Sequence, residues 1–521
     1  MFAFFKKSVK IFKVLSVNYR FRRRRFKIME KFDVIVIGAG VVGAMIAREL
    51  SRFELSVAVI EKESDVCMGT TSANTAIVHA GYDPVPGTLK AELNVRGNKL
   101  WDQVAFELGI PFKRTGDYVI GIGPEEVKGV EKIYERGKQN GVIGIEMLGR
   151  DEVLSRLPYL NKDVSVAMFA YTGGITDPFQ ATFAPMENAV MNGVKLYLNT
   201  AFEDFIFDGK KIIGIKTNKG EFLSNWVINA AGLYSDFVMH KANLHPEFKI
   251  TPRKGEYYVF DRNEFTIPDV LFPTPTELTK GIMVTTTIHG NTIIGPNAHD
   301  VEDKEDKANT PEGLDEVFKG ASKLVPQISL RHVIAIFAGL RPTGNARTPN
   351  PAIDYHHDYL IEARPDMGIL NLAGIESPGL ASSPAIAERV VELLKDSGLE
   401  LKEKKDFNPI RKPRKRFRDM SNEERAQLVK ENPLYGRIIC RCEYVTEGEI
   451  VEEIHSPIPA KTYDAIKRRT WLGTGRCQGA FDTPRVVEIL SRELGVSPLE
   501  VTKKGSGSYF LLRKTKEVEN G

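Results

Sequence analysis

The sequence predicts an α/β fold with a small, separate module at its C-terminal end. The first observation is a continuous apolar run over residues 34–37, which is typical of a strand buried in a parallel sheet. The second is a glycine turn of the form G-x-G-x-x-G directly after that run (Gly38, Gly40 and Gly43). The third is that three of the four cysteines lie in the last 82 residues, so the two ends of the chain carry different chemistry.

Each glycine of the turn has its own expected role. Gly38 permits the tight turn, Gly40 lets the backbone approach a pyrophosphate, and Gly43 lets the next helix pack on the strand. The N-terminus of that helix, expected over 44–50, offers free N–H groups to phosphates. A second strand ends at Glu61, whose carboxylate can accept hydrogen bonds from a ribose diol. The unit predicts a bound dinucleotide, and the motif itself leaves FAD and NAD open.

Three later stretches favour FAD. Residues 70–82 form a loop rich in small and hydroxyl side chains, and residues 226–236 read as an apolar strand that ends in small residues. Residues 371–384 are rich in glycine and serine and precede a helix. We expect Ser383 to cap that helix and Pro384 to occupy its first position.

Together these stretches resemble the FAD-dependent D-amino-acid-oxidase-like superfamily over about residues 30–396. The resemblance implies a Rossmann-like FAD-binding domain and an α+β substrate domain with an antiparallel sheet. It places the FAD-binding parts at about 29–110, 180–245 and 335–396, with the substrate-binding parts between them. The residues expected to hold FAD are Gly38, Gly40, Gly43, Glu61, Thr71, Ser72, Asn74, Ala231, Gly232, Gly374, Ser377, Gly379 and Leu380.

Four segments are similar to one branch of this superfamily, the glycerol-3-phosphate dehydrogenases and oxidases: 72–98, 273–296, 339–345 and 374–380. The similarity implies oxidation of the secondary alcohol of sn-glycerol 3-phosphate to dihydroxyacetone phosphate. Enzymes that oxidise L-2-hydroxyglutarate share much of the pattern, so that substrate, or another 2-hydroxy or amino acid, is the alternative. An alternative of another class is a non-catalytic electron-transfer subunit.

Oxidation of a secondary alcohol by flavin needs a base for the hydroxyl proton. His79 is the expected base, because a neutral imidazole is available near pH 7. For the anionic substrate, Arg341 offers a planar fork of donors that matches phosphate or carboxylate. By resemblance, Lys280 is a second cation for the substrate, and Ser377 hydrogen-bonds near the flavin. The alternatives are a structural histidine at 79, an ion-paired Arg341 and a Lys280 that only faces water.

The C-terminal cysteines follow the spacing C-x-C at Cys440 and Cys442, and 34 residues separate Cys442 from Cys477. This region resembles the bacterioferritin-associated-ferredoxin-like [2Fe–2S] domain, in which four thiolates hold the cluster. Asp482 stands where family members have the fourth cysteine. Aspartate can ligate iron through oxygen, although it is a harder ligand than thiolate. The expected ligands are therefore these three cysteines and Asp482. There are two alternatives: the module has lost its cluster, or the residues bind zinc.

The expected organisation has five parts: a basic extension (1–28), the FAD-dependent oxidoreductase (29–396), a linker (397–432), the small, mainly helical [2Fe–2S] module (433–500) and a tail (501–521). The extension holds ten Lys or Arg residues and no acid. It either lies on anionic lipid or precedes a true start at Met29. In the linker, we expect the basic run over 411–418 to be solvated and to pack on an acidic body.

Composition limits the remaining classes. No run of about 18 apolar residues occurs, so no transmembrane helix is expected, and four cysteines make no disulfide framework, which indicates a reducing cytoplasm. The net charge of +4 becomes −6 without the ten basic residues of the extension, so nucleic-acid binding has no support. The expected partners are a small anionic substrate and an electron-accepting protein or quinone, with membrane contact no more than peripheral at the inner face.

Overall fold

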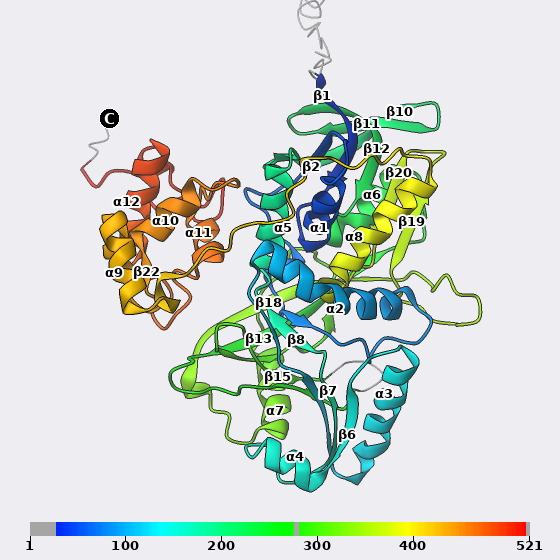
Figure 1. Cartoon of the computed structure of the whole chain (residues 1–521), viewed down its shortest axis with the longest axis vertical. Coiled ribbons are helices and arrows are strands. Elements are labelled where there is room, and N and C mark those ends of the chain that lie inside the picture. Colours follow the sequence, from blue (N-terminus) through cyan, green and yellow to red (C-terminus); the bar gives the residue numbers. More distant parts are fainter. Residues whose placement is uncertain (1–27, 276–280, 517–521) are drawn as a thin grey trace, which may run out of the picture.

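Two large sheets organise the body of the protein, and a small helical module lies beside them (Figure 1). The computed structural model describes residues 28–275 and 281–516. The predictions for Lys280 and for the basic extension as far as residue 27 therefore lie outside the described residues. None of the helices in the described part of the chain combines the length and apolar character that crossing a bilayer requires.

The first sheet carries the glycine turn. Its strands, in spatial order, are β10 (Phe202–Asp208), β11 (Lys211–Thr217), β12 (Gly220–Asn229), β1 (Ile28–Ile37), β2 (Val57–Ile60) and β9 (Lys195–Tyr197), and β20 (Ile369–Ala373) and β19 (Leu360–Arg364) continue from β12. β1 pairs in parallel with β12 on one side and with β2 on the other. The apolar run over 34–37 therefore lies in the middle of a parallel core, as predicted.

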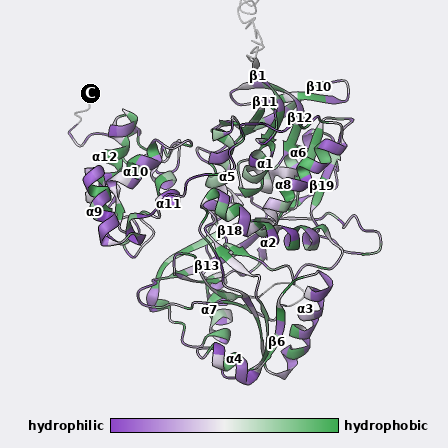
Figure 2. Ribbon diagram, viewed as in Figure 1, coloured by the Kyte–Doolittle hydropathy of each residue, from purple (hydrophilic) through white to green (hydrophobic). Residues whose placement is uncertain are grey.

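Different helices cover the two faces of this sheet. Val34 and Val36 face a core that they share with helices, and Ile35 and Ile37 face a second core on the other side, because side chains alternate along a strand. The first core is shared with α1 (Val41–Leu50), α2 (Leu89–Leu108), α5 (Gln180–Met191) and α8 (Gly379–Asp396), and the second with α6 (Ser235–Lys241). Figure 2 shows the apolar residues gathered along these central strands. This is the Rossmann-like arrangement that was expected.

Helix α8 begins earlier than predicted. Its first residue is Gly379, so Ser383 is no cap and Pro384 lies inside the helix. A proline has no N–H for the carbonyl four residues before it, here the oxygen of Leu380. The Ser383 hydroxyl donates to that oxygen at 2.9 Å, which explains how the helix continues through the proline. The early start brings the N-terminus of α8 into the large cavity described below.

The second sheet is antiparallel except for one strand pair. Its strands, in spatial order, are β17 (His299–Asp300), β13 (Ile250–Phe260), β16 (Thr292–Gly295), β15 (Met283–Thr286), β14 (Val270–Pro273), β5 (Asp117–Ile122), β7 (Val164–Ala170) and β6 (Ile145–Gly149), and β18 (Val333–Gly344) pairs with β13. β14 and β5 are the parallel pair. A three-stranded sheet of β3 (Ile77–Val78), β8 (Gly174–Thr176) and β4 (Phe112–Arg114) lies separately. The expected antiparallel sheet is confirmed apart from the one parallel pair of β14 and β5.

The C-terminal module has its own core. It consists of the pair β21 (Ile438–Cys440) and β22 (Val445–Thr446), α10 (Glu447–Ile454), α11 (Tyr463–Thr470) and α12 (Thr483–Leu494), and α9 (Asn422–Glu431) of the linker packs against its first turn at 433–436. Apolar residues of β21, β22 and the helices α10, α11 and α12 form one buried cluster. The capping boxes that start α9 and α10 are present as the sequence suggests, with Ser421 and Glu424 in one and Thr446 and Glu449 in the other. The small helical module is confirmed.

Charged contacts hold the module on the body. Asp65, in the loop after β2, accepts hydrogen bonds from Arg468 at 2.8 Å and from both terminal nitrogens of Arg469 at 2.7 and 2.9 Å, and all three side chains are buried or nearly so. The linker run over 411–418 packs on acidic groups as predicted, but only part of it is solvated, since Lys412 and Lys415 are exposed whereas Arg411 and Phe417 are buried. Arg411 is 4% exposed and donates to Glu187 at 2.6 Å, because a buried carboxylate needs a partner of opposite charge.

Candidate active site

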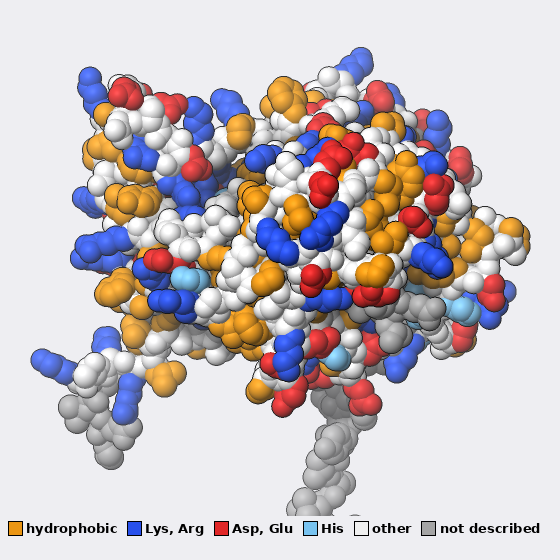
Figure 3. All heavy atoms as spheres, turned by 90° about the horizontal axis from the view of Figure 1, so that it is seen from below, with side chains coloured by type: hydrophobic (Ala, Val, Ile, Leu, Met, Phe, Trp, Pro, Cys, Tyr) orange, Lys and Arg blue, Asp and Glu red, His pale blue; other side chains and the backbone are white. Residues whose placement is uncertain are grey.

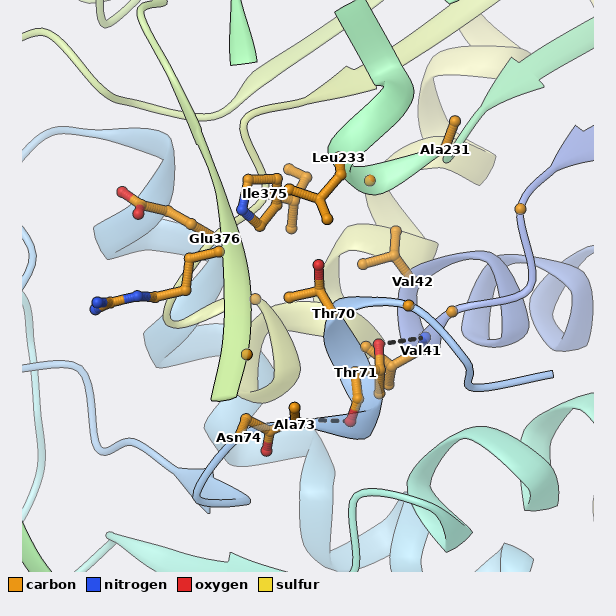
Figure 4. Close-up of a pocket in the computed structure, with 18 of the residues that line it drawn as sticks. Val41, Val42, Thr70, Thr71, Ala73, Asn74, Ala231, Leu233, Ile375 and Glu376 are labelled. Carbon is orange, nitrogen blue, oxygen red and sulfur yellow. Dashed lines mark hydrogen bonds between the residues drawn. The ribbon is translucent and has the colours of Figure 1, made fainter. Parts of the chain in front are cut away.

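A cavity of about 350 Å³ lies where the two large sheets meet (Figure 4). The first sheet contributes the glycine turn, the end of β2 and the loops around Ala231 and Ser377. The second sheet contributes Tyr257, Met283 and the stretch around Arg341. A ligand in this cavity therefore contacts both domains, which is common for cofactor sites.

The glycines of the turn serve different purposes. Gly38 has φ +106°, and a Cβ added there would lie 2.6 Å from the carbonyl oxygen of Ala230. A Cβ on Gly43 would lie 2.1 Å from the carbonyl oxygen of Gly38, so this glycine is required by helix–strand packing and does not line the cavity. The nearest atom to a Cβ on Gly40 is the Thr71 hydroxyl, at 3.3 Å. Gly40 is thus open towards the cavity, which fits the close approach of a pyrophosphate.

Glu61 lies at the end of β2 and lines the same cavity. Its two carboxylate oxygens accept hydrogen bonds from the N–H groups of Ala39 at 2.8 Å and Glu63 at 3.0 Å. Burial raises the pKa of Glu61 in spite of these bonds. The carboxylate therefore braces the glycine turn, a role the sequence did not reveal. Each oxygen keeps a second lone pair with which to accept from a ribose hydroxyl.

A short loop closes the cavity next to the N-terminus of α1 (Figure 4). The Thr71 hydroxyl accepts from the N–H of Val41 at 3.2 Å, and the Asn74 side chain donates to the carbonyl of Thr71 at 2.8 Å. Thr71 and Asn74 line the cavity, as predicted for FAD ligands. Ser72 does not; its hydroxyl donates to the carbonyl of Gly69 at 2.8 Å instead.

The remaining predicted FAD residues come from two other loops. Ala231 and Gly232 line the cavity after β12, and Ser377, Gly379 and Leu380 line it at the start of α8. Gly374 is not among the lining residues; with φ +68° it makes the turn that leads from β20 towards α8. Most of the predicted set is therefore gathered around one space, and Gly43, Ser72 and Gly374 support it from outside.

His79 and Arg341 also line this cavity. The carbonyl oxygen of His79 accepts from the side chains of Asn94 at 2.8 Å and Asn98 at 3.0 Å, which fixes its backbone against α2. The His79 ring lies 5.6 Å from the ring of Phe272. Arg341 donates to the carbonyl oxygen of Asn297 at 2.9 Å, which orients the guanidinium. The structure thus gathers the expected base and the expected cation around the predicted FAD cradle.

Glu376 is a cavity residue that the sequence reasoning missed, although it stands directly before Ser377. It pairs with Lys90 at 2.6 Å and accepts from the Thr343 hydroxyl at 2.8 Å. Burial would raise its pKa, but Lys90, the Thr343 hydroxyl and Arg341 together lower it below the usual range. The site therefore holds a fixed negative charge near Arg341.

A second missed group lies at another edge of the cavity. Glu305 accepts from the Tyr234 hydroxyl at 2.5 Å and from Lys62 at 3.2 Å, and all three line the cavity. Lys62 follows Glu61 directly in the sequence, which was a usable signal. Glu305 lies in a highly charged segment, and such segments are usually just solvated, so nothing in the sequence singled it out.

The cysteines and Asp482 come together in the C-terminal module as two pairs. Cys440 is buried next to Asp482; burial first, and then this neighbour, raise the pKa of Cys440 to about 12. Cys442 lies against Cys477, and burial followed by this contact raises its pKa. Among the described residues, no three His, Cys, Asp or Glu side chains converge as they would around a single metal ion. Two separate pairs are what a two-iron cluster requires, with two protein ligands on each iron.

Asp482 is 1% exposed and is oriented by one strong contact. The Tyr463 hydroxyl donates to its Oδ1 at 2.7 Å, while its Oδ2 has no partner within the described ranges. Leaving a buried carboxylate oxygen unsatisfied costs about 1–3 kcal/mol or more. A metal bound at Oδ2 would remove that cost, so the residues present fit an iron–sulfur group.

A glycine-turn βαβ unit, a cavity shared with an antiparallel domain and a C-terminal cysteine module define a dinucleotide-dependent redox enzyme. The chain belongs to the FAD dependent oxidoreductase family, whose model matches residues 33–393. A second family model, the BFD-like [2Fe-2S] binding domain, matches residues 438–492. The two matches cover the two regions in which the cavity and the cysteine pairs lie.

Two relatives and one solved structure show how far the similarity extends. A glycerol 3-phosphate dehydrogenase of Caloramator mitchellensis is 45% identical over 93% of this chain and 99% of its own length. The bovine mitochondrial L-2-hydroxyglutarate dehydrogenase is 28% identical over 69% of this chain and 88% of its own. The dithionite-reduced L-alpha-glycerophosphate oxidase of Mycoplasma pneumoniae, solved with FAD bound, is 29% identical with a TM-score of 0.67, and the match covers 74% of this chain and 99% of that one.

Proposed function

We propose that this chain oxidises the secondary alcohol of sn-glycerol 3-phosphate to dihydroxyacetone phosphate. The observation that carries the proposal is the placement of His79 and Arg341 on one cavity with the Gly38–Gly40 turn. The relative from Caloramator mitchellensis, which is named for this activity, supports the choice of substrate, since it matches almost the whole chain.

The side chains divide the chemistry between them. His79 takes the proton of the substrate hydroxyl as its carbon becomes a ketone. FAD, when bound, accepts the hydride that leaves that carbon. Arg341 has five N–H donors, of which those on Nη2 and Nε face the carbonyl oxygens of Asn297 and Arg253. The other donors remain for the substrate phosphate, and Lys280 is the proposed second cation.

Electrons leave the oxidoreductase through the C-terminal module, in our proposal, towards a partner protein or a quinone. Cys440, Cys442, Cys477 and Asp482 are the proposed ligands of its [2Fe–2S] cluster. The buried contact between Arg469 and Asp65 supports this, because Asp65 lies in the loop that continues into the cavity wall at Met68. Anaerobically purified chain should carry two irons and two acid-labile sulfides. Iron-free protein with full substrate-dependent activity would contradict the cluster.

Anaerobic stopped-flow absorbance tests the substrate. We expect glycerol 3-phosphate to bleach the flavin, and L-2-hydroxyglutarate to bleach it far more slowly. The reverse order would replace our substrate with the 2-hydroxy acid. A flavin that neither compound bleaches would favour the electron-transfer subunit.

The proposed base is tested by His79→Ala. We expect it to keep FAD and to slow flavin reduction at least about a hundredfold, the usual scale for a lost general base. His299→Ala is the matched control, because that side chain is 55% exposed and pairs with Glu316 on the surface. Unchanged reduction kinetics in His79→Ala would remove the assignment.

A further inference from the structure

The C-terminal module carries more basic than acidic side chains around the proposed cluster ligands. Residues 433–500 contain nine Lys or Arg and ten Asp or Glu, so the module as a whole is close to neutral. The charges are nevertheless sorted, because different contacts hold the two kinds of side chain. The distribution of these charges over the surface, and not the net charge, determines which partners the module attracts.

Three of the ten acids of the module face the linker and the body. Glu443 pairs with Arg418 at 2.7 Å and with Arg262 at 3.2 Å. Glu453 pairs with Arg414, and Glu449 accepts from the backbone of the linker. These carboxylates are 4–8% exposed, so the chain itself already neutralises and covers them.

The basic side surrounds the proposed cluster ligands. A groove of about 970 Å³ has Cys442, Cys477 and Asp482 in its wall. Five of the nine basic residues of the module line this groove, against three of its ten acids. The five are Arg437, Arg441, Arg476, Arg485 and Arg492, and the acids are Glu447, Asp482 and Glu488. Figure 3 shows basic side chains spread over the part of the surface that the module forms.

Two of these arginines are available to a partner. Arg441 is exposed and has no ion pair within the described ranges. Arg485 is 70% exposed and reaches Glu488 only at 3.6 Å, a surface pair that contributes little. Arg437 and Arg492 both pair with the buried carboxylate of Glu447, and Arg492 also pairs with Glu493 at 2.9 Å, so the charges of these two arginines are compensated within the module.

Exposed apolar side chains stand next to the same ligands. Phe481 directly precedes Asp482 and is 83% exposed. Tyr444, two residues after Cys442, is 54% exposed, and Ile438 is 44% exposed. Large exposed aromatic residues beside arginines are typical of the centre of a protein–protein interface.

We propose that this groove is the docking surface for an electron-transfer protein whose own redox centre is surrounded by acidic residues. The proposal rests on the function proposed above, in which the module passes electrons out of the enzyme. The arginines that line the groove favour an acidic partner. The position of the docking surface is inferred from Cys442 and Cys477, which lie in the groove wall. Opposite charges around the two centres would steer their encounter and raise its rate. Each oxidised substrate supplies two electrons, so two one-electron acceptors are reduced per turnover.

The test uses the full chain with FAD and two haem proteins as probes. Soluble cytochrome b5 is the acidic probe, and cytochrome c is the basic one. We expect glycerol 3-phosphate to drive reduction of cytochrome b5 much faster at low than at physiological ionic strength, because salt screens exposed charges. Reduction of cytochrome c should lack this dependence. A preference for cytochrome c at low salt would overturn the proposal.

Charge reversal locates the surface. Arg441→Glu combined with Arg485→Glu should slow reduction of cytochrome b5 at least about tenfold and flatten its salt dependence. The matched control is Lys430→Glu with Lys461→Glu, which makes the same change in net charge at exposed positions outside the groove. Equal rates in the two double variants would show that the groove is not the docking surface.

Two further measurements separate this proposal from its rivals. If glycerol 3-phosphate fails to bleach the flavin, the proposed substrate is wrong. The flavin is then reduced photochemically instead of by substrate, and the docking test can still be carried out. Sedimentation with phosphatidylglycerol vesicles tests a membrane as the occupant. Binding to vesicles that the Arg441→Glu and Arg485→Glu changes abolish, with no effect on cytochrome b5, would overturn the protein partner.

Discussion

The cavity beside the glycine turn and the cysteine site of the C-terminal module each have a carboxylate in their wall, Glu61 in the first and Asp482 in the second. The hydrogen-bond partners of these two carboxylates differ. Glu61 accepts a backbone N–H with each oxygen. Asp482 accepts from the Tyr463 hydroxyl with one oxygen, and its other oxygen is buried with no partner in the described part of the chain. The polypeptide alone provides a hydrogen-bond donor for both oxygens of Glu61, whereas Asp482 keeps one acceptor oxygen without a partner in the described residues.

This difference reflects what builds each site. The flavin cradle is made mainly by backbone: a positive-φ glycine, a helix N-terminus and the ends of strands. The cluster site is made by side chains on separate loops of one small module. We therefore expect the cradle to fail when backbone packing is disturbed, and the cluster site to fail when a single ligand is removed.

The largest effect is expected from Gly43→Ala. The new methyl group would lie 2.1 Å from the carbonyl oxygen of Gly38, so α1 has to move away from β1. We expect purified protein to retain less than a tenth of the wild-type FAD, and the apoprotein to lose about 1–3 kcal/mol of unfolding free energy, the range for overpacking. Flavin absorbance per chain and urea denaturation measure the two effects.

Two other glycines sharpen this result. Gly40→Ala meets only the Thr71 hydroxyl, at 3.3 Å, so the apoprotein should keep its stability while FAD affinity falls at least about tenfold, since the methyl group blocks the pyrophosphate. Gly149→Ala has no atom within 4 Å of its new methyl group and should change neither property. If Gly40→Ala destabilised the apoprotein as much as Gly43→Ala, the assignment of separate roles would be wrong.

The next largest effect is expected at Asp482. Asp482→Ala leaves three thiolates, so we expect most of the iron to be lost during anaerobic purification. Asp482→Cys should retain it and resist air longer, because thiolate is the softer ligand. Glu488→Ala, on an exposed side chain of the same groove, is the control. FAD content should stay constant in all three; full iron in Asp482→Ala would exclude Asp482 as a ligand.

Much of this comparison was readable from the sequence. The G-x-G-x-x-G turn, the acid at 61 and the two capping boxes are local patterns, and local patterns carry their own physical cause. The clustering of His79 with Arg341 followed only from resemblance, since more than 250 residues separate them. The sequence shows Asp482 at the position where the related domains have their fourth cysteine, but its contact with Tyr463 could not be predicted.

The failures share a physical reason. Pro384 was read as a first-turn residue because proline usually is one, yet the Ser383 hydroxyl replaces the missing N–H and the helix starts at Gly379. The linker was read as solvated because basic runs usually are, yet Arg411 meets a buried Glu187. In each case a side-chain hydrogen bond overrode a local preference: it lies within one helical turn at Pro384, and it comes from elsewhere in the chain at Arg411.

A smaller effect is expected from Asp65→Asn, which tests how the two sites are joined. The change removes the carboxylate between Arg468 and Arg469 and leaves Arg469, which is 0% exposed, with Glu453 at 3.7 Å as its remaining ion partner. Because Glu453 remains, the cost should stay below the about 3–5 kcal/mol that follows when a buried charge loses all its partners. Limited trypsin digestion should therefore release the module from the body. Asp464→Asn, which disturbs the half-exposed pair with Lys503, should digest like wild type.

The same contact predicts a pH dependence. Burial alone would raise the pKa of Asp65, but the two arginines outweigh it and lower that pKa below its ordinary value. The pair therefore contributes its full stability above about pH 4, and that stability is lost only as the pH falls through the lowered pKa. Digestion by an acid-active protease should show the module docked at pH 5 and released well below pH 4. Release between pH 5 and 7 would point to another group.

The smallest effect is expected from Tyr463→Phe, which removes one hydrogen bond beside the proposed cluster. Cβ atoms added to Gly473 and Gly479 would lie 2.5 and 2.4 Å from the Tyr463 hydroxyl, so the loop that carries Cys477 leaves room for this group. The hydroxyl holds Oδ1 of Asp482 and so fixes the orientation of the carboxylate. Removing a partner of a metal ligand typically lowers metal affinity about 10- to 100-fold.

We expect Tyr463→Phe to lose iron to a chelator faster by that factor and the electron paramagnetic resonance spectrum of the reduced cluster to change. Tyr444→Phe, on an exposed ring of the same module, should do neither. Equal chelation rates in the two variants would mean that Asp482 needs no orienting partner, and the contrast with the backbone-held Glu61 would then lose its basis.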